Sequence, residues 1–538
     1  MSAGLSQINR ALNLIPKRAE SRQAEQLRST FVDSGVAAAL EAVDHQVLYG
    51  RRGTGKTHAL RYLETEMRAQ DQIALYVDLR TVGSPDGLFG DQPLAPTERA
   101  TRLLIDLLGQ LHDALLEAAL EDETLIADAM FGRKLDALLE SITTIRVTGE
   151  VEVAREGEQK TSDKDTAGVA VRVGVGLPSL DVHASTEGTD EQRNLVRETH
   201  RGTEQRTLNF SDVARALREL AATLATKRVW LLLDEWSSVP PELQPYLGEF
   251  LVRCVFPLQM FTTKIAAIEQ QSNFRVTRSD GATIGIELGA DVAANLDLDE
   301  FMVFEQNEDK ARSFFRGLLF KHLTSGVEED KQVNGLDSET HLVSMAFSDK
   351  RAFDELVRAA EGVPRDALNI AAKAALQAAD RTISVPEVRK AARSWFQTDK
   401  EAALRSREEA QRLLNWIIDK VIKQKRARGF MVNQKATSAP LLRALFDARV
   451  LHVVRRGYSA QDEPGERYDV YVIDYGAYVD LIHTKYEPQG TLPLGMDGGG
   501  DGEYVEVPWQ DLRALRRAIL DLEEFRQHEN ALAQQPSA

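Results

Sequence analysis

Cysteine is nearly absent from this chain, and so are long apolar runs. One thiol, Cys254, among 538 residues cannot form an internal disulfide and cannot build a cysteine-based zinc site. No uninterrupted apolar stretch reaches the roughly 18 residues that a membrane-spanning helix needs. The first 23 residues also lack the apolar region of a signal peptide. We therefore expect a cytoplasmic protein that does not enter a membrane.

Positive charge is scarce as well. The chain carries 66 Lys and Arg against 83 Asp and Glu, which gives a formal net charge of −17. Such a balance disfavours nonspecific coating of nucleic acid along the whole molecule. Residues 405–460 are the exception, with 13 basic side chains against 4 acidic ones. This asymmetry places any contact with DNA or RNA in residues 420–456.

Five short apolar segments have the composition of buried strands, and helical patterns separate them. They are residues 46–50, 73–80, 228–236, 264–270 and 300–304. Apolar strands that alternate with helices indicate a parallel sheet covered by helices on both faces. We therefore predict an α/β fold with a parallel five-stranded sheet at 46–305, preceded by a helical segment at 1–45.

A β-rich insert interrupts this pattern at 143–190. Residues 145–153 and 167–177 alternate valine with polar residues, which predicts a β-hairpin, and 180–186 is a candidate third strand. The insert could be a packed or inter-subunit β-element, a hairpin that contacts substrate in a pore, or a membrane-inserting hairpin. Charged residues on its second face argue against membrane insertion.

The rest of the chain divides into a helical part and a mixed part. Residues 306–398 show helical patterns throughout and predict an all-α lid. Residues 404–486 combine helices with two strands around a polar loop and predict a separate domain. A Gly-rich linker at 487–507 and a C-terminal helix and tail at 508–538 follow.

A glycine-rich loop follows the first predicted strand. Residues Gly50–Thr57 match the pattern G-x-x-x-x-G-K-T, with a helix predicted directly after it. In such a loop the backbone N–H groups surround the β-phosphate, the lysine reaches the β- and γ-phosphates, and the threonine hydroxyl binds Mg²⁺. The predicted nucleotide-contacting residues are Gly50, Arg51, Arg52, Gly53, Thr54, Gly55, Lys56, Thr57 and His58. For His58, packing is the alternative interpretation.

Two carboxylates end the strand at 228–236. Asp234 is expected to hold Mg²⁺ through its water shell, and Glu235 to polarise the attacking water as general base. The alternative is that both residues merely end a strand at a solvated loop. Because the glycine-rich loop requires a carboxylate on a neighbouring strand, we favour the catalytic interpretation.

Two further segments carry groups that could sense the γ-phosphate. Gln270, at the polar end of the next strand, is a candidate contact to the phosphate or the attacking water, and Glu269, Ser272 and Asn273 are alternatives for this role. Arg365 follows Gly362 and Pro364, which start a helix in the predicted lid. An arginine in that first turn can contact the γ-phosphate and couple the nucleotide state to the lid.

These motifs together resemble the AAA+ ATPases, and within them the origin-recognition and replication-initiator branch. The resemblance lies in GRRGTGKT, LLLDE, a polar-ended fourth strand and GVPR, and it covers about residues 20–490. Residues 16–27 are similar to the branch's N-terminal Arg/Glu box near adenine. Residues 404–486 resemble its winged-helix domain. The resemblance implies ATP and Mg²⁺ as cofactors and a homo-oligomer.

The chain departs from that branch in two ways. The β-rich insert is not part of the basic initiator core, and no arginine finger is evident. Arg253, Arg275 and Arg278 are candidates by position only. Within the basic segment, the expected phosphate contacts are Lys423, Lys425, Arg426, Arg428, Arg443, Arg449, Arg455 and Arg456.

Two functions remain open at this point. The first is an ATP-hydrolysing switch or motor that oligomerises and acts on nucleic acid or a nucleoprotein partner. The second is a signalling scaffold, for example in antiviral defence, that binds ATP with little turnover and docks a protein through the winged helix or the hairpin.

Overall fold

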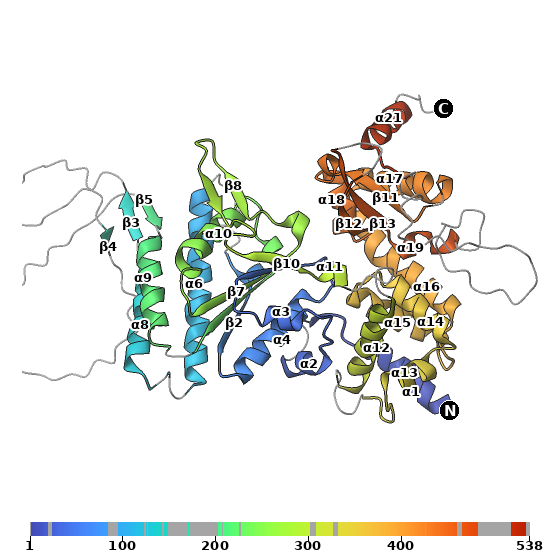
Figure 1. Cartoon of the computed structure of the whole chain (residues 1–538), viewed down its shortest axis with the longest axis horizontal. Helices are drawn as coiled ribbons and strands as arrows, with labels where there is room; N and C mark the ends of the chain where they lie inside the picture. Colours follow the sequence, from blue (N-terminus) through green and yellow to red (C-terminus); the bar gives the residue numbers. More distant parts are fainter. Residues whose placement is uncertain are drawn as a thin grey trace, which may run out of the picture.

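The computed structural model describes residues 2–19, 24–83, 95–122, 125, 127–142, 145–148, 170–171, 203–206, 208–224, 227–301, 308–325, 332–425, 427–459, 465–481 and 518–533. These residues form two bodies with separate hydrophobic cores, which lie beside each other along the long axis of the molecule (Figure 1). We call residues 24–301 the sheet body. Residues 2–19 together with 308–533 form the lid body. None of the helices described is both long and apolar enough to span a bilayer.

The sheet body is built on a parallel five-stranded sheet, which confirms the predicted α/β class. Its strand order is β10 (Ala293–Asp297), β1 (Gln46–Tyr49), β7 (Phe261–Ala267), β6 (Val229–Asp234) and β2 (Ile73–Asp78). Successive side chains of a strand point to opposite faces, so Val47 packs in one core and Leu48 in the other. Both faces are therefore apolar and need helices to cover them.

Helices cover the two faces of the sheet unequally. The smaller core, which contains Leu48, is closed by α3 (Ala37–Leu40) and α4 (Lys56–Ala69). The larger core is closed by four helices, which lie on the other side of the sheet in Figure 1: α6 (Pro96–Leu120), α8 (Ala129–Ile142), α9 (Phe210–Ala221) and α10 (Gln244–Phe250). The short helix α2 (Ala24–Thr30) lies against α4.

The fifth strand differs from the sequence prediction. We expected it at 300–304, but β10 runs over Ala293–Asp297 and Leu298–Phe301 is the short helix α11. The side chain of Asp297 accepts a hydrogen bond from the Asp299 N–H at 2.9 Å. Such a side-chain acceptor favours a turn over continued strand, so the strand ends at Asp297 and a helix begins at Leu298. Residues 302–304 lie outside the described residues.

Part of the predicted insert is described. Strand β3 (Ile145–Thr148) pairs antiparallel with β4 (Ala170–Val171), as the predicted hairpin requires, and Ile145 lies opposite Val171. On its other edge β3 pairs antiparallel with β5 (Thr203–Arg206), a strand that the sequence did not predict. The predicted third strand at 180–186 lies outside the described residues. A separate hairpin, which the sequence did not predict, pairs β8 (Arg275–Thr277) with β9 (Thr283–Gly285).

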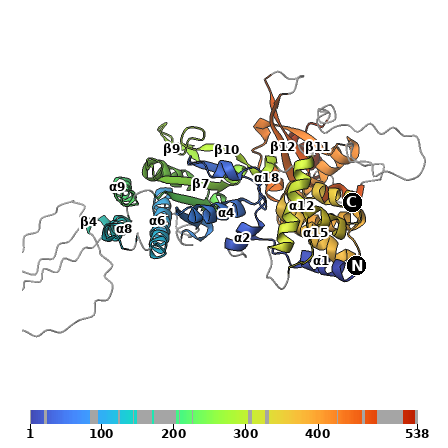
Figure 2. The same cartoon turned by 60° about the horizontal axis from the view of Figure 1, so that its bottom comes forward.

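The lid body begins with helix α1 (Ser2–Leu14), which lies beside α12 and α15 although they are more than 290 residues away in sequence (Figure 2). The lid helices are α12 (Glu308–Thr324), α13 (Glu339–Ala346), α14 (Lys350–Ala359), α15 (Pro364–Ala378) and α16 (Val385–Trp395). The N-terminal helical segment therefore divides between the two bodies, because α1 packs in the lid core and α3 in the sheet core.

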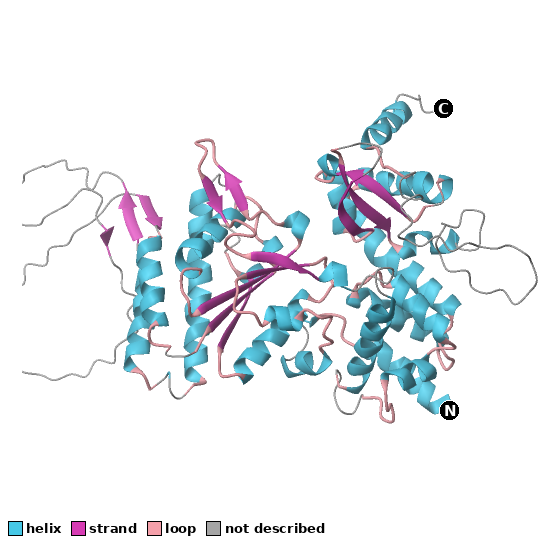
Figure 3. Cartoon of the chain, viewed as in Figure 1, coloured by secondary structure: helices cyan, strands magenta, loops and turns pink. Residues whose placement is uncertain are grey.

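The C-terminal domain contains a three-stranded antiparallel sheet in the order β11, β13, β12 (Figure 3). Its elements are α17 (Glu408–Ile417), β11 (Gly429–Asn433), α18 (Pro440–Asp447), β12 (Leu451–Ser459), β13 (Arg467–Ile473) and α19 (Tyr475–Tyr478). The sequence predicted β12 and β13 but missed β11. The winged-helix interpretation of this domain stays a prediction.

The last described segment is anchored to the C-terminal domain. Met431 of β11 donates its N–H to the Ala518 carbonyl at 2.8 Å and accepts from the Leu520 N–H at 2.9 Å. Helix α21 (Leu522–Ala533) follows and overlaps the end of the helix predicted at about 508–527. Residues 508–517 lie outside the described residues.

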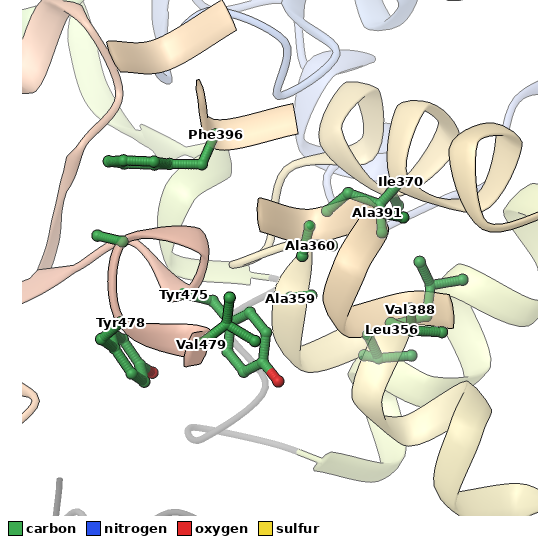
Figure 4. Close-up of a cluster of buried hydrophobic side chains, with 14 of the residues drawn as sticks. Leu356, Ala359, Ala360, Ile370, Val388, Ala391, Phe396, Tyr475, Tyr478 and Val479 are labelled. Carbon is green, nitrogen blue, oxygen red and sulfur yellow. The ribbon is translucent and has the colours of Figure 1, made fainter. Parts of the chain in front are cut away.

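The lid and the C-terminal domain share one hydrophobic core. Figure 4 shows Tyr475 and Tyr478 of α19 on one side of this cluster and Leu356 and Val388 of the lid on the other, with Phe396 above them. Tyr475 is almost fully buried, and its hydroxyl donates to the carboxylate of Glu355. Separating the two parts would expose this apolar surface to water, so they form a single unit.

Candidate nucleotide-binding site

The glycine-rich loop connects β1 to α4, as predicted, and two of its glycines are required by close contacts. At Gly53, where φ is +91°, an added Cβ would lie 2.9 Å from Cβ of Arg365. At Gly50 a Cβ would lie 2.5 Å from the Thr54 hydroxyl. Any larger residue would therefore push the loop away from the lid or distort its turn.

Lys56 occupies the first turn of α4 and points back along the loop. Its ammonium donates to the carbonyls of Gly50 at 2.7 Å and Arg51 at 3.0 Å. Burial lowers the pKa of Lys56 below its ordinary value, although the carboxylates of Glu235 and Asp299 oppose that shift. A phosphate is a stronger partner for this ammonium than two neutral carbonyls, because the hydrogen bond is then charged on both sides.

Asp234 and Glu235 end strand β6 in different environments. Asp234 is fully buried, and its carboxylate accepts from the Tyr76 hydroxyl at 2.7 Å and from the Glu235 N–H at 2.8 Å. Burial and the neighbouring Asp234 charge raise the pKa of Tyr76, so its hydroxyl stays a donor. Glu235 has left-handed backbone angles, with φ 56° and ψ 40°. For a residue other than glycine this conformation costs about 1–3 kcal/mol and is concentrated at functional sites.

Arg365 lies in the first turn of α15, as predicted, and contacts the loop directly. Its backbone N–H donates to the Gly53 carbonyl at 3.2 Å. The lid therefore touches the glycine-rich loop through the residue expected to sense the γ-phosphate.

A cleft of about 300 Å³ lies where the sheet body meets the lid body. Its size is at the lower end of the range for small-molecule sites. The described residues that line it carry six basic side chains and a single carboxylate, that of Glu235. The six are Lys17, Arg18, Arg52, Lys56, Arg80 and Arg365. In a chain of net charge −17, this concentration of positive charge favours a polyanionic ligand.

The cleft brings together most of the predicted site residues. Those that line it are Arg52, Gly53, Gly55, Lys56, Thr57, His58, Glu235 and Arg365. His58 also packs, since its Nε2 lies 2.7 Å from the Leu27 carbonyl oxygen and its ring contacts Phe31 edge-on. Both interpretations of His58 are therefore compatible with its position.

The other predicted site residues are not among the described residues that line the cleft. Thr54 closes the loop turn, since its hydroxyl donates to the Arg51 carbonyl at 2.8 Å. Gln270 lies in the short helix after β7 and is not among the described residues that line the cleft. Asp234 lies beneath Glu235, where it is inaccessible to solvent.

Arg51 has a supporting position behind the loop. It is 2% exposed, and the Asp299 carboxylate accepts from its backbone N–H at 2.9 Å and from its Nε at 2.7 Å. One of its terminal nitrogens donates to the Glu361 carbonyl at 3.3 Å. The sequence predicted a nucleotide contact here, but the side chain instead joins the loop to the residues that precede α15.

Thr57 and Asp234 fit the predicted Mg²⁺ site. Mg²⁺ prefers hard oxygen ligands and usually keeps several waters, and the Thr57 hydroxyl lines the cleft. The carboxylate of Asp234 is oriented by the hydrogen bonds that it accepts from the Tyr76 hydroxyl and the Glu235 N–H. Asp234 would therefore suit an outer-sphere role through metal-bound water.

Sequence reasoning missed several residues that line the cleft. They are Lys17, Arg18, Arg80, Ser238 and His322. Lys17 and Arg18 fall in the segment expected near adenine. The sequence thus indicated the segment but not which of its residues line the cleft. Arg80 ends the predicted strand at 73–80, where a polar residue after a buried strand is a usable signal.

Two of the arginines expected to bind nucleic acid instead lie between the lid and the C-terminal domain, where Arg449 is buried and Arg428 is partly buried. Arg449 is 9% exposed and donates to Asp366 at 2.9 Å. Lys400 pairs with the same carboxylate at 2.7 Å, and Asp366 itself is fully buried. Arg428 donates to the two carboxylate oxygens of Glu361 at 2.7 and 2.8 Å. The prediction of phosphate contacts by Arg449 and Arg428 was therefore wrong, because buried acidic partners hold both side chains.

A third arginine of that group, Arg456, joins the C-terminal domain to the sheet body. Its guanidinium contacts the carboxylate of Glu269, which lies just past β7. Beside this pair, Gln271 donates to the Asp447 carboxylate at 2.5 Å. The end of β7, where the sequence predicted a γ-phosphate sensor, therefore contacts the C-terminal domain.

Comparison with known proteins gives one family match. The ORC-CDC6-like family model matches residues 14–83, which include the glycine-rich loop and its flanking strand and helix. No curated protein matches the chain.

Among solved structures, two archaeal proteins are similar at low identity. The Walker-type ATPase PABY2304 of Pyrococcus abyssi shares 14% identity, with a TM-score of 0.36, over 88% of this chain and 99% of that one. Cdc6p from Pyrobaculum aerophilum shares 12%, with a TM-score of 0.30, over 87% and 93%. Neither likeness is close enough to bear on the site. The family match over residues 14–83 confirms the predicted resemblance to the ORC-CDC6-like ATPases.

Proposed function

We propose that this chain is an ATP-binding and ATP-hydrolysing switch whose two bodies close on the nucleotide. One observation carries the proposal: the glycine-rich loop and Glu235, from the sheet body, line the same cationic cleft as Arg365 of the lid body. A nucleotide in that cleft would contact both bodies at once. Binding free energy would therefore favour the closed arrangement over any other.

Each residue has a chemical task in this proposal. Lys56 and Arg365 bind the phosphates, and Mg²⁺ held near Thr57 and Asp234 would neutralise charge on them. Glu235 accepts a proton from the attacking water, whose oxygen bonds to the γ-phosphorus while the bond from that phosphorus to the β-phosphate oxygen breaks. The products are ADP and inorganic phosphate.

The C-terminal domain is positioned to follow the nucleotide state. Its buried partners lie next to the site residues in sequence: Asp366 follows Arg365, and Glu361 shortly precedes it. Glu269 lies at the end of β7. Because the lid and the C-terminal domain form one unit, closure would carry this domain along with Arg365 and would strain or release its pair with Glu269 of the sheet body. This arrangement supports a switch that transmits its state to that domain.

Turnover tests the switch proposal. Glu235→Gln should retain ATP binding and lower steady-state hydrolysis by about 100-fold, because removing a general base typically costs 10²–10⁴ in rate. Lys56→Ala should lose binding of a fluorescent ATP analogue, which tests the site itself. If wild type binds ATP but hydrolyses it no faster than Glu235→Gln, the hydrolysing switch is rejected.

The alternative is a scaffold that binds ATP with little turnover and docks a protein partner. One observation favours it: three arginines of the basic segment are engaged in ion pairs within the chain, which reduces the charge left for nucleic acid. Helix α18 also buries Leu442, Leu445 and most of its apolar face. The same turnover experiment separates the two functions.

The proposal includes two kinds of partner: a nucleic acid and further copies of this chain. Among the residues expected to contact phosphate, Lys423, Lys425, Arg443 and Arg455 are exposed, and Arg426 lies outside the described residues. We propose that these four exposed side chains contact phosphate. Arg253 and Arg275 lie at the surface of the sheet body in ion pairs with Glu249 and Glu287, where a neighbouring copy could meet them.

A further inference from the structure

Arg80 lines the cleft but belongs neither to the glycine-rich loop, nor to the strand that ends in Asp234 and Glu235, nor to the lid. It lies in the short helical turn Leu79–Thr81, directly after β2. Asp78, the last residue of β2, is the register partner of Asp234 in the parallel pair of β2 and β6. Because parallel strands end at the same edge of the sheet, Arg80 emerges beside Asp234 and Glu235.

The position of the Arg80 side chain is set by Asp78. The carboxylate accepts from the Arg80 backbone N–H at 3.0 Å, from Nε at 3.0 Å and from Nη2 at 2.6 Å. Burial opposes ionisation of Asp78, but these hydrogen bonds outweigh it and lower its pKa below the ordinary value. The pair therefore stays charged, and the guanidinium is held in one orientation rather than extending freely into water.

Arg80 lines the cleft with Lys56, Glu235 and Ser238. Because Glu235 is the proposed general base, the attacking water would lie beside it. The γ-phosphate, which that water attacks, would therefore lie at this end of the cleft. A guanidinium has five N–H donors in a planar fork. It can therefore bind a carboxylate and a phosphate oxygen together.

We propose that Arg80 is a γ-phosphate ligand, contributed by the chain's own sheet body, that distinguishes ATP from ADP. This inference rests on the proposed ATP site and names a contact that neither the glycine-rich loop nor the lid provides. Lys56 approaches the phosphates from the loop and Arg365 from the lid, whereas Arg80 approaches from the edge of the sheet. The positive charge would stabilise the charge that moves onto the ADP oxygen as the bond to the γ-phosphorus breaks.

The test compares nucleotide affinities rather than activity alone. Arg80→Ala should weaken binding of a non-hydrolysable ATP analogue about tenfold or more while leaving ADP affinity unchanged, because only ATP has the γ-phosphate. Turnover should fall by about 100-fold. Arg80→Lys keeps the charge without the planar donor set and should recover part of the ATP preference.

Arg102→Ala is the matched control, since Arg102 also pairs with a nearby carboxylate, Glu98, and is similarly exposed, but on α6 away from the cleft lining. It should change neither affinity. Equal losses for ATP and ADP in Arg80→Ala, or no loss of either, would overturn the assignment of Arg80. If wild type binds neither nucleotide, the proposed function itself fails, which is a separate outcome.

Discussion

A lysine buried inside the sheet body should make the stability of that body depend on pH. Lys264 lies in the central strand β7 and is fully buried. Its ammonium donates to the carbonyls of Ala42 at 2.6 Å and Asp44 at 2.9 Å and contacts the Gln46 side chain. Burial lowers the pKa of Lys264 from 10.5 to about 7, with only partial compensation by Asp44.

The sign of the pH effect follows from where the proton is bound. From about pH 7 to pH 10 the unfolded chain keeps Lys264 protonated while the folded chain releases the proton, so stability rises with pH. With about 1.4 kcal/mol per pKa unit, the gain between pH 7 and pH 9 is about 2 kcal/mol. Below pH 7 the charge is present in both states, and its burial opposes folding in full.

Urea unfolding of wild type and Lys264→Met at both pH values measures this term. The free energy of unfolding of wild type minus that of the variant should increase by about 2 kcal/mol from pH 7 to pH 9, whatever this difference is at pH 7. The offset at pH 7 is a separate quantity, because the variant also leaves three buried acceptors without their donor. Lys134→Met, at a surface pair with Glu219, controls for loss of a positive charge. A difference that does not change with pH would refute the reasoning.

Two further predictions concern the C-terminal domain. Asp366→Asn should destabilise the lid body by about 3–5 kcal/mol, because Lys400 and Arg449 would lose a buried partner; Asp212→Asn, at an exposed pair with Arg215, should change unfolding by less than about 1 kcal/mol. A loss no larger than the control's would contradict a buried network. DNA or RNA affinity, measured by anisotropy, should fall steeply with salt, and the slope should flatten when the exposed basic residues are changed to alanine. No binding at low salt would reject nucleic-acid contact. The four residues are Lys423, Lys425, Arg443 and Arg455.

Local patterns were sufficient to predict the centre of the site. Gly50–Thr57 and the strand ending in Asp234 and Glu235 have signals that depend on a few adjacent residues, because backbone geometry and phosphate chemistry restrict which types can stand there. Arg365 was predicted for the same reason, since Gly362 and Pro364 mark a helix start. Strand β10 was misplaced, because the Asp297 turn outweighed the apolar pattern that follows it.

The roles of the arginines could not be assigned in this way. Arg449 and Arg428 belong to the most basic part of the chain, and their acidic partners Asp366 and Glu361 lie more than 60 residues away in sequence. A charged side chain gives the same sequence signal whether it faces phosphate, water or a buried carboxylate. Only the packing of the C-terminal domain on the lid decides between them.

The sequence by itself thus determined the class of fold, the glycine-rich loop after β1 and the strand that ends in Asp234 and Glu235, because each depends on short-range geometry. The tertiary structure decided which parts pack together as one unit. It joined the N-terminal helix, the lid and the C-terminal domain in a single core, and it placed Arg80 beside Glu235 in the cleft between the bodies. Both results depend on contacts between residues far apart in the chain, and such contacts are formed by the folded packing alone.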